Sequence, residues 1–301
     1  MKKFQQIIKE IALELDIRYT FLSDDYIIKL EKDNIIKFIY AYKFPLNDQG
    51  ISLILDDKYA FYSVLKNLNI KTVEYLPIYK NYDKKELIKY LNKEKQVIIK
   101  SNNGTCGSEV FKIENEADLF FKIDFLLTKN SPVLISPYYD IRNEYRLIVL
   151  NNEVKLLYGK KRPIIIGNGE KTIKELLQEF NSNYFTDSNL YNLNIEFDKI
   201  LKLNEKLEID FKFNLSKGAI LFFPDDMVLN NKLKNIALSI SQELNIKFAS
   251  IDIIELNNQE LLVLEANSGI MMDNFIELSE NGYLDAKCIY KEAILSLFTL
   301  K

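Results

Sequence analysis

The sequence contains no histidine among its 301 residues, and this absence removes whole classes of chemistry. Without an imidazole there is no Ser–His or Cys–His nucleophile pair and no His-ligated metal site. If the chain is an enzyme, its chemistry has to use carboxylates, lysines, arginines and backbone amides. These groups are suited to phosphate and to hard metal ions.

Cysteine is also scarce, and the two cysteines, Cys106 and Cys288, lie far apart without the spacing of a metal site. They offer no disulfide framework, so we expect a reducing, cytoplasmic compartment. No apolar run approaches the ~20 residues that a membrane span needs. Polar side chains interrupt residues 1–15, which predicts an amphipathic helix rather than a secretory signal, and we expect no membrane partner.

A strong excess of charge of either sign is absent as well. The chain has 40 basic and 43 acidic residues and a net charge of -3, which argues against nucleic acid as the main partner. Its hydrophobic fraction of 48% is ample for a buried core and for two or three subdomains.

Helical and strand-like periodicities alternate along the chain, which predicts an α/β or α+β fold. The expected helices cover residues 3–15, 56–69, 83–92, 115–127, 171–181, 228–244 and 284–298. Extended segments are expected at 75–80, 95–100, 132–139 and in the first part of 163–170. Hairpins are expected at 26–42, at 144–162 with a turn at Asn151–Asn152, and at 248–266 with a turn at Asn257–Asn258.

Oxygen-bearing side chains stand on the two closing strands. Asp252 lies among apolar neighbours in the first strand, and Glu265 and Asn267 lie two positions apart, on one face of the second. If the strands pair across their turn, the three side chains can converge as ligands that suit Mg²⁺. The alternative is that Asp252 is a solvent-facing strand residue and that Glu265 begins a loop.

A glycine-containing loop follows the predicted strand that ends in Lys100. Gly104 and Gly107 would let backbone N–H groups approach phosphate oxygens, and the lysine would add a point charge. Glycines at strand-to-loop junctions are common, so an ordinary loop is the alternative. The loop is not a Walker loop, since GxxxxGK[ST] is missing.

Charged residues gather at the open end of the 144–162 hairpin. Glu144 and Arg146 share one strand face, and Lys160, Lys161 and Arg162 end the partner strand. Lysine and arginine together suit a triphosphate or an acyl phosphate. The alternative is that these charges are simply solvated, as charges at strand ends usually are.

The order of these parts resembles the ATP-grasp superfamily of carboxylate–amine ligases. KKRPIIIGNGEKTIKELLQEFN, residues 160–181, is similar to the RxPxxxxGDGxxTIxELI…N signature of the ATP-grasp module in cyanophycin synthetases and bifunctional glutathione synthetases. NLSKGA, residues 214–219, is similar to NLSTGG of the same group, although alone it would be an ordinary polar turn. The likeness covers residues 56 to about 280.

The resemblance implies an α+β, ATP-grasp fold in which two α+β subdomains clasp ATP. It divides the chain into a short N-terminal region, residues 1–55, a central subdomain, residues 56–135, and a C-terminal subdomain, residues 136–301. Lys58 and Lys100 would bind the ATP phosphates, and Glu144 would lie at the ribose. The loop 102–108, with Gly104, Thr105 and Gly107, would cover the triphosphate. The hinge 136–139, with Tyr138 and Tyr139, would clasp the adenine. Catalytic roles, mostly at the γ-phosphate and the acyl phosphate, would fall to Arg146, Lys161, Arg162 and Asn214. Mg²⁺, or Mn²⁺ in its place, would be bound by Asp252, Glu265 and Asn267.

Three residues depart from the pattern of these relatives. Glu109 stands where many have a further loop glycine, Pro137 replaces a hinge glutamate, and Asp210 replaces an arginine before NLS. Pro137 would leave adenine recognition to backbone groups. Asp210 weakens any transfer of the relatives' amino-acid substrate, and residues 1–55 are short for the usual preceding domain.

The activity that the resemblance implies is ATP-dependent amide formation through an acyl phosphate, with release of ADP and phosphate. The expected partners are a small-molecule or peptide carboxylate and an amine. A small-molecule kinase of the same superfamily and a non-catalytic nucleotide-binding subunit are the alternatives. Dimers are common in the superfamily, so a homodimer is one open option for the assembly.

Overall fold

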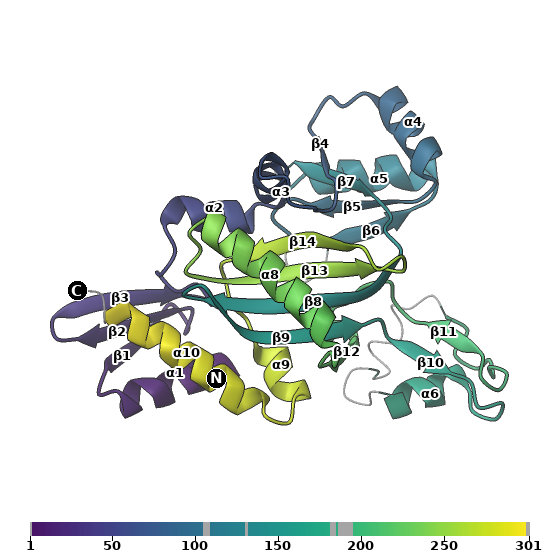
Figure 1. Ribbon diagram of the computed structural model, residues 1–301. Coiled ribbons are helices and arrows are strands. Elements are labelled where there is room, and N and C mark those ends of the chain that lie inside the picture. The colour runs from purple at the N-terminus through teal and green to yellow at the C-terminus, as the bar shows by residue number, and fades with distance from the viewer. Residues whose placement is uncertain (1, 105–108, 130–131, 181–184, 186–194, 299–301) are drawn as a thin grey trace.

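The computed structural model describes residues 2–104, 109–129, 132–180, 185 and 195–298. Within them the strands form sheets of three, four, five and two strands, with helices packed on their faces (Figure 1). This arrangement confirms the mixed α and β class predicted from the sequence. None of the described helices is long and apolar enough to cross a membrane. The predicted loop residues Thr105 and Gly107 lie outside the described ranges.

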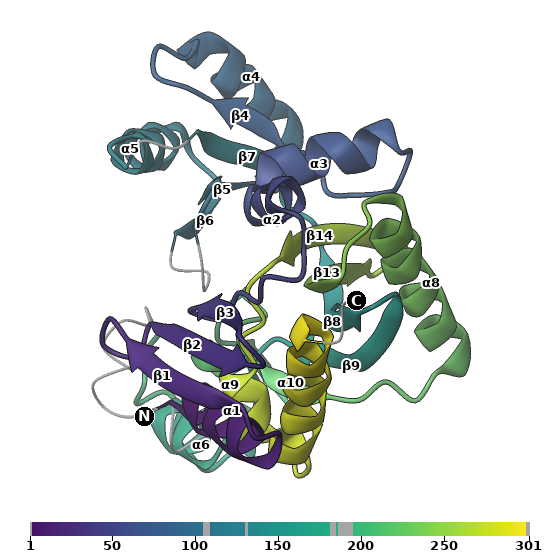
Figure 2. The same cartoon turned by 90° about the vertical axis from the view of Figure 1, so that its left-hand side faces the viewer.

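The N-terminal residues form helix α1 (Lys3–Glu14) and an antiparallel sheet of β1 (Arg18–Leu22), β2 (Ile27–Lys32) and β3 (Ile35–Tyr40). The helix and the β2–β3 hairpin agree with the prediction, whereas β1 is an addition to it. α1 packs against α10 (Gly282–Phe298) and α9 (Asp273–Leu278), as Figure 2 shows. The two ends of the described chain therefore share one hydrophobic core.

Two short helices, α2 (Gln49–Asp56) and α3 (Lys58–Asn67), follow one another directly. Asp48 and Asp57 cap them by accepting hydrogen bonds from the backbone N–H groups of Gly50 and Ala60. α3 agrees with the helix predicted at 56–69, whereas α2 is an addition. Both pack onto the five-stranded sheet through Leu55, Phe61 and Leu65.

The four-stranded sheet, called the small sheet below, is antiparallel with the order β4-β7-β5-β6. Its strands are β4 (Leu76–Ile78), β5 (Val97–Ser101), β6 (Val110–Ile113) and β7 (Val133–Pro137). The helices α4 (Lys84–Glu94) and α5 (Glu116–Leu127) pack on it around buried aliphatic side chains. Lys100 lies near the end of β5, at the border of this sheet.

The five-stranded sheet, called the large sheet below, is antiparallel with the order β12-β9-β8-β13-β14. Its strands are β8 (Ile141–Leu150), β9 (Glu153–Lys161), β12 (Ile220–Phe222), β13 (Phe248–Leu256) and β14 (Leu261–Asn267). Asn151 and Asn152 form the predicted turn with φ of 51° and 62°, a conformation that asparagine tolerates. Helix α8 (Met227–Glu243) covers one face together with α2 and α3.

A smaller unit of β10 (Ile164–Ile166), β11 (Lys206–Glu208) and α6 (Ile173–Phe180) follows β9 and has its own apolar cluster. The proposed division at residues 55 and 135 stays a prediction. The strands of the small sheet lie almost entirely within residues 56–135, in agreement with that division. In contrast, α3, which was assigned to the same central subdomain, packs on the large sheet.

Candidate active site

A strip of charged side chains crosses the face of the large sheet opposite α8. The cross-strand register pairs Glu144 with Lys160, Arg146 with Asp252, and Asp252 with Glu265. Residues that pair directly across antiparallel strands lie on the same face. Most of the strip is buried, because Asp252 is 1% exposed, Lys160 is 5% exposed and Glu144 is 9% exposed, whereas the side chains of Arg146 and Glu265 are each 23% exposed.

The burial follows from the neighbours of the strip on the same sheet face. Ile148 and Phe248 belong to the core that the large sheet shares with α1 and α10. On the other side of the strip, Ile254 and Leu262 belong to a second apolar cluster, which reaches Leu134 of the small sheet. The charges are thus enclosed between two hydrophobic clusters, where electrostatic interactions are stronger than in water.

Two one-residue bulges decide which side chains join the strip. In β9 the register with β8 shifts so that Lys155 is the extra residue and Lys160 faces Glu144. In β14 the register with β13 shifts so that Leu264 is the extra residue and Glu265 faces Asp252. Regular alternation without the bulges would turn Lys160 and Glu265 to the opposite face.

Asp252 is held by a bidentate ion pair. Arg146 donates from Nε to Asp252 Oδ1 at 2.8 Å and from Nη2 to Oδ2 at 2.6 Å. Lys160 Nζ lies 3.5 Å from Asp252 Oδ1 and also pairs with Glu144. Burial would raise the pKa of Asp252, but Arg146 and Lys160 outweigh it and lower that pKa. Burial dominates at Glu144, whose pKa is raised.

Glu265 faces two lysines from other elements. Its Oε2 lies 3.7 Å from Lys58 Nζ at the start of α3 and 3.9 Å from Lys100 Nζ. Lys58 Nζ also donates to the backbone oxygens of Asn102 at 3.3 Å and Gly104 at 2.8 Å. Burial lowers the pKa of both lysines, and Glu265 opposes that shift. Lys58 therefore ties α3 to the start of the predicted glycine loop.

The strip carries more positive than negative charge. Together with Lys58 and Lys100, which reach it from α3 and β5, it contains four cations and three carboxylates; the other five residues are Arg146, Lys160, Glu144, Asp252 and Glu265. A buried excess of cations favours an anionic ligand, and phosphate oxygens accept charge-assisted hydrogen bonds from such groups.

The predicted metal ligands lie on this face as well. Asp252 pairs with Glu265, and Ser250 pairs with Asn267, so the three predicted ligands share one side of β13–β14. Glu265 makes ion pairs of 3.7 and 3.9 Å, longer than hydrogen bonds, whereas both oxygens of Asp252 bind Arg146 closely. Oxygen donors fit Mg²⁺, and Glu265 is the carboxylate more readily available to it. Among the described residues no three His, Cys, Asp or Glu side chains form a metal cluster, so Asn267 would be needed as the third ligand.

Lys161 lies outside the strip. Its Nζ is 4.5 Å from the centre of the Phe222 ring, which packs on the α8 side of the sheet. The structure brings Lys160 into the strip, a residue to which the sequence prediction gave no role of its own. The signal that identifies Lys160 is its register with Glu144, which depends on the bulge at Lys155.

Arg162 and Asn214 lie beyond the end of β9. Arg162 Nη1 donates to Glu208 Oε1 at 2.8 Å, and its guanidinium lies 5.1 Å from the centre of the Phe213 ring. Asn214 caps the short helix η1 (Leu215–Lys217) by accepting from the backbone N–H of Ser216. Both have local structural partners, Glu208 for Arg162 and the backbone of Ser216 for Asn214.

The predicted hinge and loop residues lie at the border of the small sheet. Tyr138 N donates to Gln96 O at 3.0 Å, and Tyr139 OH accepts from Glu74 N at 3.0 Å. At Gly104 a Cβ would lie 3.2 Å from Ser101 Cβ, so a larger residue would crowd the end of β5.

Glu109, the residue in place of a loop glycine, is bound away from the strip. Its carboxylate forms an ion pair with Lys129, just after α5, and the lysine balances the negative charge of the glutamate. The hydrogen bond from Lys129 lowers the pKa of Glu109, so the carboxylate is ionised. This departure from the relatives therefore has a local structural explanation.

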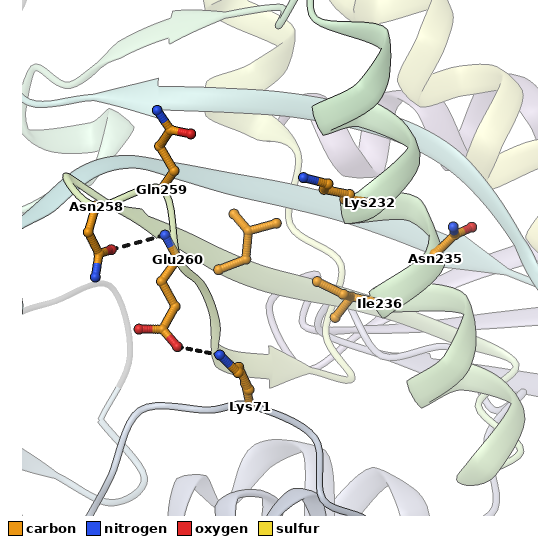
Figure 3. A pocket seen from close by; sticks show the side chains of 8 residues that line it. Lys71, Lys232, Asn235, Ile236, Asn258, Gln259 and Glu260 are labelled. Carbon is orange, nitrogen blue, oxygen red and sulfur yellow. Dashed lines mark hydrogen bonds and ion pairs between the residues drawn. The ribbon is translucent and has the colours of Figure 1, made fainter.

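An open hollow of about 660 Å³ lies elsewhere, between α8 and the turn that joins β13 to β14 (Figure 3). Lys71 Nζ donates to Glu260 Oε1 at 2.6 Å, and Glu260 N donates to Asn258 Oδ1 at 3.0 Å. None of its lining residues is a predicted site residue; they are Lys71, Lys232, Asn235, Ile236, Asn258, Gln259, Glu260 and Leu261. The charged strip, rather than this hollow, is the candidate site.

Comparisons with known proteins match two parts of the chain to ATP-grasp families. A family model described as YheC/D-like ATP-grasp matches residues 50–132, and one described as a RimK-like ATP-grasp domain matches residues 172–288. The bifunctional glutathione biosynthesis protein of Clostridium perfringens is 27% identical over 248 residues, which are 74% of this chain and 31% of that protein. A cyanophycin synthetase of Geminocystis herdmanii is 23% identical over 178 residues, which are 52% of this chain and 20% of that protein.

A solved structure extends the likeness to the fold. The crystal structure of a bifunctional glutathione synthetase from Pasteurella multocida matches 97% of this chain and 44% of that chain, with a TM-score of 0.57 and 16% identity. This match confirms the fold predicted from the sequence. The chain spans about a third of the length of the curated glutathione biosynthesis proteins that it matches, at 31% and 35% of two of them.

Proposed function

We propose that the chain, which belongs to the ATP-grasp superfamily, is an ATP-dependent ligase that joins a carboxylate to an amine. In this proposal a carboxylate oxygen attacks the γ-phosphorus of ATP and ADP leaves. The amine then attacks the acyl phosphate, a C–N bond replaces the C–O bond to phosphate, and phosphate and a proton are released. ATP with Mg²⁺ is the cofactor pair that ATP-grasp ligases use, in agreement with the cofactors predicted from the sequence.

The observation that carries the proposal is the buried, net positive strip. During phosphoryl transfer, negative charge spreads over the phosphoryl oxygens, and fixed cations in a water-poor site stabilise it. The cations already stand close to one another and are held by the carboxylates and apolar clusters around them. A reaction of this kind needs positioning and charge, without histidine or a covalent enzyme intermediate.

We assign the roles within the strip by position. Lys58 and Lys100, from α3 and β5, would bind ATP phosphates, since both reach the same carboxylate from the side of the small sheet. Arg146, fixed by Asp252, and Lys160 would stabilise the phosphoryl group during transfer. Lys160 takes the role that the sequence prediction gave to Lys161. Arg162 remains a proposed contact of the γ-phosphate and the acyl phosphate, and Asn214 remains a proposed catalytic residue.

Asp252, Glu265 and Asn267 would hold Mg²⁺ on the same face of β13–β14. When bound, the metal supplies charge to the phosphate oxygens as a Lewis acid. Glu265 is the ligand that also pairs with Lys58 and Lys100, so the same carboxylate offsets the repulsion between the two lysines.

For the two substrates we propose a chemical class only. The curated relatives are named for glutathione biosynthesis and cyanophycin synthesis, which supports a small-molecule or peptide carboxylate and an amine. Asp210, where the relatives have arginine, argues for a substrate that differs from theirs. We propose a cytoplasmic reaction and keep the homodimer as an option for the assembly.

The test is ADP and phosphate release from ATP and Mg²⁺ with pooled amino acids and small carboxylates, followed by chromatography of the nucleotides. Release that requires both a carboxylate and an amine would support the ligase. Release with a single acceptor would identify a kinase instead, and AMP with pyrophosphate would refute the acyl-phosphate route. ATP binding without turnover across the pool would favour the non-catalytic subunit.

A further inference from the structure

A buried tyrosine stands where the chain passes from the large sheet to the small sheet. Val263 N donates to Lys71 O at 3.0 Å and Val73 N donates to Val263 O at 3.1 Å, so residues 71–73 run beside β14. Three residues later, β4 pairs with β7 in the small sheet. Tyr75 lies between these two pairings and is 3% exposed.

The ring of Tyr75 belongs to the apolar cluster that joins the two sheets. Leu134 of β7 contributes from the small sheet, and Ile254 of β13 and Leu262 of β14 contribute from the large sheet. The ring centre of Tyr62, from α3, lies 5.8 Å away in an edge-on arrangement. Packing on all these elements holds the hydroxyl of Tyr75 in one position.

That hydroxyl connects Lys100 to β14. Lys100 Nζ donates to Tyr75 OH at 2.6 Å, and Tyr75 OH donates to Leu264 O at 3.3 Å. An ammonium group can only donate, so the tyrosine has to use its single proton for the carbonyl, and the direction of both bonds follows. Leu264 is the bulge residue that turns Glu265 onto the strip.

The ammonium group of Lys100 lies closer to the Tyr75 hydroxyl than to the Glu265 carboxylate. Glu265 Oε2 lies 3.9 Å from the ammonium, beyond hydrogen-bonding distance, whereas the tyrosine oxygen lies at 2.6 Å. The Lys100 side chain is 8% exposed, so little water is available to orient it. A long lysine side chain has many rotamers, and a fixed acceptor is needed to select one.

We propose that Tyr75 is a positioning residue of the active site, which holds the Lys100 ammonium beside the bulge of β14 so that it can receive a phosphate group of ATP. This inference rests on the proposed function, because it takes Lys100 to be a phosphate ligand. Tyr75 itself acts through Lys100 and does not touch the nucleotide. Removal of the neutral Tyr75 hydroxyl would leave the charged groups around Lys100 in the protein; they are Lys58, Glu144, Asp252 and Glu265.

The test is a double-mutant cycle on nucleotide affinity in the full chain. The variants are Tyr75→Phe, Lys100→Gln and the double variant, and Mg²⁺·ATP binding is measured by isothermal titration calorimetry. Tyr62→Phe is the matched control, since its ring lies in the same cluster but its hydroxyl accepts from Lys66 Nζ at 3.5 Å and not from Lys100.

We expect Tyr75→Phe to weaken ATP binding about tenfold, the effect of a lost hydrogen bond to a charged group. Tyr62→Phe should change it less than about twofold, and Tyr75→Phe should have no further effect once Lys100 is Gln. A merely structural Tyr75 would weaken binding by the same factor in both backgrounds, which would overturn the inference.

Two further arms keep the result interpretable. If the unchanged protein fails to bind ATP, the proposed function fails, and this outcome differs from additivity among variants that bind. If Lys100→Gln binds too weakly to titrate, the same cycle is measured on the free energy of unfolding in urea without nucleotide. Additive losses there would show that the two side chains are not coupled, and would also overturn the inference.

Discussion

Asp252 and Glu265 are direct cross-strand partners, and the bulge at Leu264 is what makes them so. Like charges placed opposite each other in a sheet are destabilising unless other groups compensate them. Here each carboxylate has its own pair of cations, drawn from β8 and β9 for Asp252 and from α3 and β5 for Glu265. The arrangement concentrates charge from separate elements at one place, and the following predictions test its parts.

Asp252→Asn should abolish turnover in the ADP-release assay and also destabilise the fold. The amide keeps the shape of the side chain but removes the negative charge that Arg146 and Lys160 share. Removal of one partner from a buried ion pair typically costs about 3–5 kcal/mol. We expect a loss approaching that range in the free energy of unfolding, measured with urea, because buried cations would be left without their counter-ion.

Glu255→Gln is the matched control for that variant. Glu255 lies on the same strand, is 6% exposed, and accepts hydrogen bonds from Asn143 Nδ2 at 2.8 Å and Tyr145 OH at 2.7 Å on the α8 side. We expect this variant to lose stability and to keep turnover. Comparable turnover in the two variants would contradict the role of Asp252.

Lys160→Met should reduce turnover by at least about a hundredfold, the scale seen when one electrostatic donor is removed from an active site. Lys161→Met, one position along the same strand, should reduce it less than about twofold, because Lys161 stacks on Phe222 at the other face. The measurement is the rate of ADP formation at saturating ATP for both variants. The reverse order of effects would show that the bulge at Lys155 does not set the active face.

Gly167→Ala should destabilise the unit formed by β10, β11 and α6. A Cβ on Gly167 would lie well under 3.0 Å from Lys202 O and from Leu201 Cβ, so the backbone would have to move. Such overpacking typically costs about 1–3 kcal/mol. Gly269→Ala is the control, since a Cβ there would lie at least 3.5 Å from its nearest neighbours. Thermal unfolding should separate the two, and equal transition temperatures would refute the close approach at Gly167.

Glu10 should make the docking of α1 on α10 sensitive to acid. Hydrogen bonds from Lys287 and Tyr283 lower the pKa of Glu10 from 4.5 to about 2. A carboxyl pKa lowered by folding stabilises the protein above pH 4.5, and this stabilisation disappears as the pH falls towards 2. The pair lies at the surface, so the effect should stay below about 1 kcal/mol.

The measurement is urea unfolding of the unchanged protein and of Glu10→Gln at pH 7, 4 and 3. The difference in free energy of unfolding between the two proteins should shrink as the pH falls. A difference that stays constant across this range would mean that the ionised Glu10 carboxylate does not hold α1 against α10.

Much of the fold could be predicted because its signals are local. The amphipathic pattern of α1, the asparagine turn between β8 and β9 and the caps at Asp57 and Asp83 each specify an element from a few neighbouring residues. α2 was harder to predict, since its apolar residues 51 and 53–55 form a short run, interrupted only by Ser52, that is compatible with a buried strand or a helix.

The site could be predicted only in part, and the reason is the register of the strands. Spacing showed that Glu265 and Asn267 share a face, but whether that face is the one with Asp252 depends on the bulge at Leu264. The same holds for the choice between Lys160 and Lys161. A bulge is selected by the packing of the whole sheet, so an alternating pattern in one strand carries no signal for it.

The passage of the chain between the two sheets has a mechanical consequence. The chain enters the small sheet after Tyr75 and leaves it before Ile141, and Glu74 N donates to Tyr139 OH at 3.0 Å between these two segments. Two connections fastened together act as a pivot, and the displacement of each atom in a rotation grows with its distance from that pivot. If the small sheet rotates about this point, Lys100, which is bonded to Tyr75, would move little and α4 at the far end would move the most (Figure 1).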